Sequence, residues 1–328
     1  MKKEYLGIDL GSENTVIYSY KQNRILFQEP TCIALDSRSG QIKEVGYLAS
    51  KIEGKTPFPI KIIYPIRRGL VNDDDALYRY LSSVFHQLHL DLKHNPTTLV
   101  LTAPSLCGKT DRKVLIQVAK KLFAKEVFIE PEAKRAALGS CDKAYTPNAT
   151  LVRNIGSGVT DTAILSLGEI VSWDTSFISG DSFSEAIRRY RIQKQHLSIG
   201  RKTSSYIKRT IGTLSKSSSN KLIEVKGRDT LTSLPSSILI SSGEIKNVLA
   251  PLADYLVRKV TDVIASVSPE LAADLTKTGL TLTGGGTLLS GLKDYFRDAL
   301  SIPVHVADNP KLSVAVGLKN YISHREGK

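Results

Sequence analysis

Two short stretches of the sequence have the residue types that bind phosphate. The first is "GIDLGSENTVIY", with a Gly-Ser pair at 11–12, and the second is "LVRNIGSGVTDTAI", with Gly-Ser-Gly at 156–158. Phosphate oxygens need closely spaced backbone N–H groups, which small residues in tight turns present because no Cβ blocks the approach. Either stretch alone fits an ordinary glycine turn, whereas two such turns facing each other could hold a triphosphate.

The two stretches also share an order of residues. Each runs from an apolar strand through Asp9 or Asn154 to an aliphatic residue, a Gly-Ser pair, a threonine and a second strand. Gly11 and Gly156 lie about 145 residues apart. We therefore expect two related halves, each beginning with a phosphate-binding hairpin.

A third stretch, "LTLTGGGTLLSGL", places three consecutive glycines between a buried strand and a helix. Such a loop lets a flat ring approach the backbone, and it would point the N-terminus of the following helix at a ligand. Three adjacent glycines cost backbone entropy on folding. This cost favours a functional loop over a simple strand-to-helix turn.

Elements that could position these stretches alternate along the chain, which predicts an α/β fold. The strands are expected at 5–11, 14–20, 30–36, 97–104, 126–132, 169–178 and 279–286, besides the second hairpin itself. The helices are expected at 71–88, 111–124, 133–140, 181–193, 241–267 and 287–300. Turn-forming residues fill 36–65, which predicts a small excursion from the main sheet.

Composition sets further bounds. The 328 residues are 41% hydrophobic and 23% charged, which is typical of a soluble protein with two domains or subdomains. Apolar runs are too short to span a bilayer, and the start does not have the pattern of a signal peptide, so we expect a cytoplasmic protein. The net charge of +13 favours binding to an anionic partner. Residues 186–228 hold twelve Lys or Arg against one acid, which fits either a solvated basic face or a nucleic-acid surface.

The order of these motifs resembles the MreB/Mbl family of bacterial actins, within the superfamily of actin and sugar-kinase ATPases. The resemblance covers nearly the whole chain, through "GIDLGSENTVIY", "EPTCIAL", "YPIRRGLVND", "KEVFIEPEAKRAALG", "ISGDSFSEAI", "SPELAADLTKTGLTLTGGGTLLSGL" and "IPVHVADNPKLSVAVGLKNYI". It implies an actin-like α/β fold of two related domains, each with a central mixed sheet and a smaller subdomain, with a nucleotide cleft between them. The boundaries it implies are IA at 1–33, 66–146 and 309–328, IB at 34–65, IIA at 147–181 and 244–308, and IIB at 182–243.

The resemblance also implies ATP and Mg²⁺ as ligands and assigns residues to them. Asp9 would face the magnesium ion through water. The nucleotide-binding positions would be Gly11, Ser12, Glu13, Asn14, Thr15, Gly156, Ser157, Gly158, Thr160, Gly180, Asp181, Ser205, Lys208, Gly284, Gly285, Gly286 and Thr287. Gapless alignment places Glu132 where the family has the acid that orients the attacking water. A shift of one residue would choose Glu130 instead.

Three positions depart from the family pattern. Asn154 stands where the family has Asp, Val159 where it has Thr, and Ser205 where it has a ribose-binding Glu. Asn154 lacks a negative charge that would help hold hydrated magnesium, and Val159 lacks a hydroxyl that would position water. We therefore expect ATP binding with slow hydrolysis.

The resemblance implies head-to-tail filaments, single or paired, that lie against the anionic inner face of the cell membrane and could include paralogous MreB proteins. The membrane-contacting loop would be "HQLHLDLKHNP", through Leu88, Leu90 and Leu92, unless this segment is only the end of a helix. Two other functions remain open: an active ATPase or small-molecule kinase, and a nucleic-acid-binding protein that uses 186–228. No recognition-helix or zinc pattern supports specific nucleic-acid binding.

Overall fold

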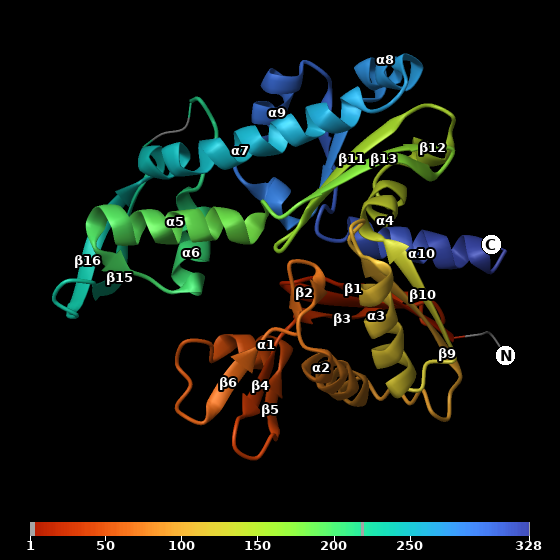
Figure 1. Ribbon diagram of the computed structural model, residues 1–328, viewed down its shortest axis with the longest axis horizontal. Helices are drawn as coiled ribbons and strands as arrows, with labels where there is room; N and C mark the ends of the chain where they lie inside the picture. The colour runs from red at the N-terminus through yellow and green to blue at the C-terminus, as the bar shows by residue number, and fades with distance from the viewer. Residues whose placement is uncertain (1–3, 218–219, 328) are drawn as a thin grey trace. The chain divides into compact units, whose positions relative to one another are not determined.

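The computed structural model of the chain describes residues 4–217 and 220–327. The chain divides into two compact units (Figure 1). Unit 1 comprises Met1–Thr146, Leu167–Ile170 and Lys311–Lys328, and unit 2 comprises Pro147–Ser166 and Val171–Pro310.

The described residues of unit 1 form a five-stranded mixed sheet in the order β10-β9-β1-β2-β3. Its strands are β1 (Glu4–Leu10), β2 (Asn14–Ser19), β3 (Arg24–Pro30), β9 (Thr97–Ala103) and β10 (Glu126–Pro131). β1, β2 and β3 form an antiparallel meander, whereas β9 pairs in parallel with both β1 and β10. β9 is buried along its whole length, as its continuous apolar run predicts.

Helices cover both faces of this sheet. Side chains of α2 (Asp74–Gln87) and α3 (Lys109–Lys121) pack with Leu6 and Ile8 of β1 on one face. Leu318 and Ile322 of α10 (Ser313–Arg325) pack with Tyr5 on the other, and α10 crosses α4 (Glu132–Leu138) there. As predicted, an aspartate caps α2: the Asp73 side chain accepts a hydrogen bond from the Ala76 N–H at 2.8 Å.

A smaller sheet accounts for the predicted excursion. It has the order β5-β4-β6 and consists of β4 (Ile33–Asp36), β5 (Ile42–Val45) and β6 (Ile60–Ile63), with α1 (Gly46–Lys51) beside it. The short pair β7 (Ile66–Arg67) and β8 (Leu70–Val71) leads back to α2, and a 3-10 helix, η1 (Asp142–Tyr145), follows α4.

Unit 2 repeats the topology of unit 1. Its five-stranded sheet has the order β13-β12-β11-β17-β18, made of β11 (Thr150–Ile155), β12 (Thr160–Ser166), β13 (Glu169–Ser176), β17 (Leu280–Thr283) and β18 (Val304–Val306). As in unit 1, the first strand pairs antiparallel with the second and in parallel with a strand much later in the chain. Two related halves were expected from the sequence, and the matching strand orders confirm them.

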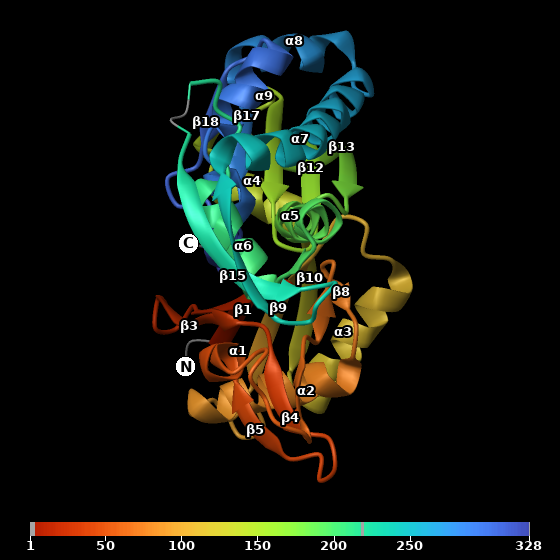
Figure 2. The same cartoon turned by 90° about the vertical axis from the view of Figure 1, so that its left-hand side faces the viewer.

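The helices of unit 2 pack on this sheet and on one another. They are α5 (Gly180–Gln195), α6 (Arg201–Ile211), α7 (Ser242–Ala265), α8 (Pro269–Thr278) and α9 (Leu292–Leu300). A further small sheet joins β14 (Leu197–Ser198) to the hairpin of β15 (Leu222–Asp229) and β16 (Pro235–Ser241). Figure 2 shows this hairpin lying alongside α6, with which β15 is in contact.

Several elements differ from the sequence-based expectation. The strand expected at 30–36 begins only at Ile33, as β4, and the outer strand β3 before it was not predicted because it is largely exposed and has no apolar signature. Residues 186–228 contain α6 and the strand β15, which were not predicted. The helix expected from 287 begins only at Leu292, because Gly291 adopts a left-handed conformation (φ 75°) and a Cβ there would lie 2.3 Å from the Ser215 nitrogen. The glycine-rich loop is instead followed by a 3-10 helix, η2 (Gly285–Leu288).

Candidate functional site

The first glycine turn, residues 11–14, lies between β1 and β2 in unit 1. The Gly11 N–H donates to the Asn14 carbonyl at 3.0 Å, and a Cβ on Gly11 would lie 2.7 Å from that oxygen. Glycine is therefore required for this closure. The turn is held from outside as well, because the Thr31 hydroxyl donates to the Gly11 carbonyl and the Gly69 N–H donates to Ser12 Oγ, both at 2.8 Å.

Asp9 lies two residues before this turn. The Thr102 hydroxyl on β9 donates to Asp9 Oδ1 at 2.9 Å. Burial raises the pKa of Asp9 to about 6, and the hydrogen bond from Thr102 acts in the opposite direction. An ionised carboxylate with a raised pKa is stabilised by a nearby cation, so this environment suits a hydrated divalent ion. Sequence reasoning missed Thr102, although a polar residue at the end of the apolar run "TTLVLTAP" was a signal.

The second glycine turn, residues 156–159, lies between β11 and β12 in unit 2 and closes in the same way. The Gly156 N–H donates to the Val159 carbonyl at 2.9 Å, and a Cβ on Gly156 would lie 2.9 Å from that oxygen. The two glycine turns are thus equivalent in position and in closure. Their small residues form the kind of cradle that a phosphate needs.

The N-terminus of α5 abuts the second glycine turn. The Gly180 N–H donates to the Gly156 carbonyl at 2.9 Å, and the Asp181 N–H donates to the Ser157 carbonyl at 2.8 Å. Lys208 of α6 donates from Nζ to the Gly180 carbonyl at 2.6 Å. One helix start and one cation, both assigned from the resemblance, are therefore brought to the same turn.

The glycine-rich loop packs against the other side of this turn. A Cβ on Gly284 (φ 82°) would lie 2.4 Å from the Ile155 carbonyl oxygen, and one on Gly286 would lie 2.3 Å from Ile155 Cγ2. These two glycines permit the close approach of the loop to β11. The loop is closed on itself, since the Thr287 hydroxyl donates to the Gly284 carbonyl at 2.8 Å.

Asn154 sits between the second glycine turn and the loop. The Thr283 hydroxyl, at the end of β17, donates to Asn154 Oδ1 at 3.2 Å. Asn154 pairs across the hairpin with Asp161, whose carboxylate accepts a hydrogen bond from the Thr175 hydroxyl at 2.5 Å. Thr283 was not singled out from the sequence, although it directly precedes the three glycines.

The two candidate acids have different surroundings. Glu130 is the last residue but one of β10 and forms an ion pair with Arg135 at 3.4 Å, and the Arg135 side chain is only 2% exposed. Glu132 is the first residue of α4 and is 6% exposed. Glu130 therefore compensates the charge of a buried guanidinium.

Several assigned side chains are engaged within the protein. The hydroxyls of Thr15 and Thr160, each at the start of a second strand, bind Thr31 Oγ1 and the Ile178 carbonyl, and both threonines are fully buried. Val159 is 4% exposed. Glu13 contributes its backbone carbonyl to the Thr31 N–H at 2.9 Å, and Ser205 lies on α6, partly exposed.

The leucines expected to contact a membrane are mostly packed inside unit 1. Leu92 is 6% exposed and belongs to the core around α2, so the expectation is wrong for this residue. Leu88 and Leu90 are partly buried against the same core. His86 and Gln87 of this segment are the end of α2, and its other residues form the loop that leads to β9.

The basic region 186–228 is partly neutralised by its own unit. Arg188 and Arg189 both pair with Glu185, at 2.7 and 3.0 Å. Arg191 is fully buried, with Glu244 3.8 Å away. Other cations of the region lie exposed on α6 and β15.

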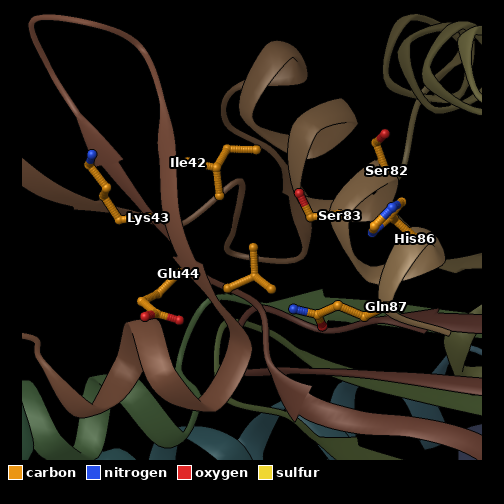
Figure 3. A pocket seen from close by; sticks show the side chains of 8 residues that line it. Ile42, Lys43, Glu44, Ser82, Ser83, His86 and Gln87 are labelled. Carbon is orange, nitrogen blue, oxygen red and sulfur yellow. The ribbon is translucent and has the colours of Figure 1, made fainter.

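A cavity of about 430 Å³ lies elsewhere in unit 1, between β5 and α2. Figure 3 shows Ile42 and Glu44 of β5 on one side and Ser83, His86 and Gln87 of α2 on the other. None of the residues assigned to the nucleotide lines it.

Comparison with known proteins identifies the family of the chain. A model of the MreB/Mbl protein family matches residues 3–327. The chain belongs to the MreB/Mbl family. It is 34% identical over 312 residues to the cell shape-determining protein Mbl of Bacillus cereus, across 95% of this chain and 93% of that protein.

Solved structures of MreB 5 of Spiroplasma citri have the same actin-like fold. The structure bound to AMPPNP matches with a TM-score of 0.94 and 30% identity, over 99% of this chain and 98% of that one. The structure bound to ADP matches with a TM-score of 0.93 and 31% identity, over 100% and 99%. This chain is thus a member of a family of actin-like proteins that includes cell shape-determining proteins.

Two properties of the described residues concern metal ions and membranes. These residues contain no group of three or more His, Cys, Asp or Glu side chains that could hold a metal ion. Among them, no helix is both long and apolar enough to cross a bilayer.

Proposed function

We propose that the protein is a cytoskeletal, MreB-like protein that binds ATP with Mg²⁺, hydrolyses it slowly and assembles head to tail into filaments. The observation that carries this proposal is the equivalence of the two glycine turns, each closed by a Gly N–H bond to a carbonyl three residues later. A tight turn of this kind presents closely spaced backbone N–H groups, which can bind phosphate oxygens. The nucleotide-bound structures of Spiroplasma citri MreB 5 support ATP as the ligand.

Residues of both units would contribute to nucleotide binding. The first turn, with Ser12 to Asn14, and the second turn, with Gly156 to Gly158, would bind phosphate oxygens through backbone N–H groups. Lys208 would add positive charge beside the second turn, and the loop of Gly284 to Gly286 would contact the adenosine. Asp9 would hold hydrated magnesium through water, and the ion would neutralise charge on the phosphates.

Slow turnover follows from the chemistry of the second turn. Glu132 would orient the attacking water. Asn154 brings no negative charge to the magnesium shell, and Val159 brings no hydroxyl to the water. Losing one such group in an active site commonly costs about 10² in rate, while most binding contacts persist.

The cellular setting is part of the same proposal. The filaments, single or paired, would lie in the cytoplasm against the anionic inner face of the cell membrane, in cell shape or motility. Paralogous MreB proteins could copolymerise with them. The net charge of +13 supports an anionic partner surface.

Electron microscopy and sedimentation of the purified protein test the proposal. Filaments should form with Mg²⁺ and ATP or AMPPNP, and phosphate should be released far more slowly than from a family member with the intact acid. Absence of nucleotide binding would refute the site assignment. Rapid phosphate release without assembly would favour the ATPase or kinase alternative, and a salt-dependent shift of DNA would favour a nucleic-acid function.

A further inference from the structure

The tip of the β15–β16 hairpin, defined as residues 229–235, presents two leucines to solvent. Leu231 is 74% exposed and Leu234 is 64% exposed. The tip lies at the far left of Figure 1, past the end of α5. Large apolar side chains at a protruding turn have no pocket of their own chain to fill, so they are available to another surface.

The backbone of the tip is arranged so that its N–H groups need no water. Asp229 Oδ1 accepts from the Leu231 and Thr232 N–H groups, both at 2.8 Å. The Ser233 N–H donates to the Asp229 carbonyl at 3.0 Å, and the Leu234 N–H donates to Thr232 Oγ1 at 3.3 Å.

The remaining donor of the tip is satisfied by the end of α5. The Thr230 N–H donates to the His196 carbonyl at 2.7 Å. All five N–H groups from Thr230 to Leu234 therefore have acceptors inside unit 2. An apolar medium penalises unsatisfied backbone donors, so the paired N–H groups of this turn add little to the cost of moving it out of water. The same bonds hold the turn in one conformation, so little ordering entropy is lost on binding.

Cations lie directly behind the leucines. Lys226 and Arg228 are on the exposed face of β15, opposite Ser237 and Pro235 of β16. Strand residues rise about 3.3 Å each, so both cations lie within roughly 10 Å of the turn along the strand. Lys194, at the end of α5, is also exposed, and it lies two residues from the His196 carbonyl that binds the tip.

We infer that this tip is the membrane-contacting element, with Leu231 and Leu234 inserting among lipid headgroups while Lys226 and Arg228 bind their anionic phosphates. The inference rests on the membrane association proposed above and supplies its contact surface in place of the buried Leu92. An apolar tip followed by a basic belt matches the depth profile of an anionic bilayer surface. A nucleic acid would use the cations but not the leucines.

Vesicle flotation of the full chain, with Mg²⁺ and AMPPNP, tests this inference. The protein should float with vesicles of phosphatidylcholine and phosphatidylglycerol and should remain in solution with phosphatidylcholine alone. Leu231→Ser with Leu234→Ser should reduce partitioning about tenfold or more. Lys226→Ser with Arg228→Ser should reduce it about 25-fold, at roughly fivefold for each cation.

A matched control removes exposed leucines away from the tip. Leu222 and Leu239 lie on the same exposed face of the hairpin, 61% and 65% exposed, but further from the turn. Leu222→Ser with Leu239→Ser should float like the wild type. Nucleotide binding and sedimentation of filaments without vesicles should be unchanged in all three double variants.

A fluorescent label gives a second readout that a folding defect would not mimic. A Ser233→Cys variant carrying an environment-sensitive dye, made in a Cys141→Ser background, should show a blue shift on anionic vesicles. The same dye at Ala273→Cys, an exposed position on α8, should not respond.

The outcomes separate this inference from the broader proposal. If the wild type floats and the leucine variant floats equally well, the tip is not the contact surface, although membrane association stands. If the wild type does not float, both fail. If the leucine variant loses filament assembly in solution, the tip contacts protein and the inference is overturned. If only a salt-dependent shift of DNA depends on Lys226 and Arg228, the surface binds nucleic acid instead.

Discussion

Asp9 and Asn154 occupy equivalent positions at the ends of β1 and β11, two residues before the two glycine turns. Each accepts a hydrogen bond from a threonine hydroxyl on the neighbouring parallel strand, from Thr102 at 2.9 Å and from Thr283 at 3.2 Å. The two halves therefore share this threonine hydrogen bond, but Asp9 has a carboxylate where Asn154 has a neutral amide. Only the Asp9 position can attract a cation by charge, and the Asn154 position can offer only the dipole of an amide.

The charge at Asp9 should cost stability when no cation is present. Its pKa is raised to about 6, so the ionised form is disfavoured in the folded state. This loss in the free energy of unfolding is absent below about pH 4, increases between about pH 4 and 6, and is constant above about pH 6. Asp9→Asn should therefore raise the free energy of unfolding of the nucleotide-free protein at pH 7.5, by about 1–3 kcal/mol, and have no effect near pH 4.

Urea unfolding at the two pH values measures this change. Asp298→Asn is the matched control, because Lys216 and Arg297 lower the pKa of Asp298 and its neutralisation should not stabilise the protein at pH 7.5. Asp9→Asn should also weaken the dependence of ATP binding on Mg²⁺. Equal stability of the wild type and Asp9→Asn at pH 7.5 would contradict the role of burial.

Restoring the family residues in the second turn should raise turnover. Asn154→Asp with Val159→Thr should increase phosphate release about 10- to 100-fold, because a charge for hydrated magnesium and a hydroxyl for water are both regained. The new carboxylate would face Asp161 across the hairpin, so the nucleotide-free protein should be less stable. Val159→Thr alone should have the smaller kinetic effect. Unchanged phosphate release in the double variant would refute this account of slow hydrolysis.

The two candidate acids can be told apart by kinetics and stability together. Glu132→Gln should slow phosphate release by about 10- to 100-fold. Glu130→Gln should destabilise the protein by about 2–4 kcal/mol, because it leaves the buried Arg135 guanidinium without its ion-pair partner. The reverse pattern, with a stable but inactive Glu130 variant, would assign the water-orienting role to Glu130.

The crossing of α4 and α10 should tolerate no side chain at Gly317. A Cβ there would lie 1.8 Å from the Arg135 carbonyl oxygen, so Gly317→Ala should force the helices apart and destabilise unit 1 by about 2 kcal/mol or more. Because α4 begins at Glu132, phosphate release should fall as well. Gly200→Ala is the control, since a Cβ at Gly200 meets no atom within 4 Å. Thermal unfolding that is equal for the two variants would contradict the close packing.

Lys208 should contribute more to nucleotide affinity than Lys202, the other lysine of α6. Its Nζ donates to the Gly180 carbonyl at the start of α5, beside the second turn. Lys208→Met should weaken ATP binding about tenfold, as expected for the loss of a hydrogen bond from a charged group. Lys202→Met removes an exposed lysine of the same helix and should bind ATP normally. Fluorescence titration with a labelled nucleotide measures both, and equal affinities would remove Lys208 from the site.

The sequence by itself determined the local features of this protein. The glycine spacing, the alternation of strands and the cap of α2 are set by neighbouring residues, so the two hairpins, the main helices and the repeat of the two halves were predictable. The family resemblance assigns Asp9 and Gly156 to the nucleotide site, and these assignments stay predictions. These features depend on backbone geometry within a few residues of each position.

Only the tertiary structure decided which of these residues face one another and which are covered. The partnership of Thr102 with Asp9, the ion pair of Glu130 with Arg135, the burial of Leu92 and the exposure of Leu231 all join or separate segments far apart in the chain. Helix α9 begins late because Gly291 packs against residues near 215, which no local pattern records. Burial is a property of the whole packed unit, and the apolar character of a single leucine does not determine it.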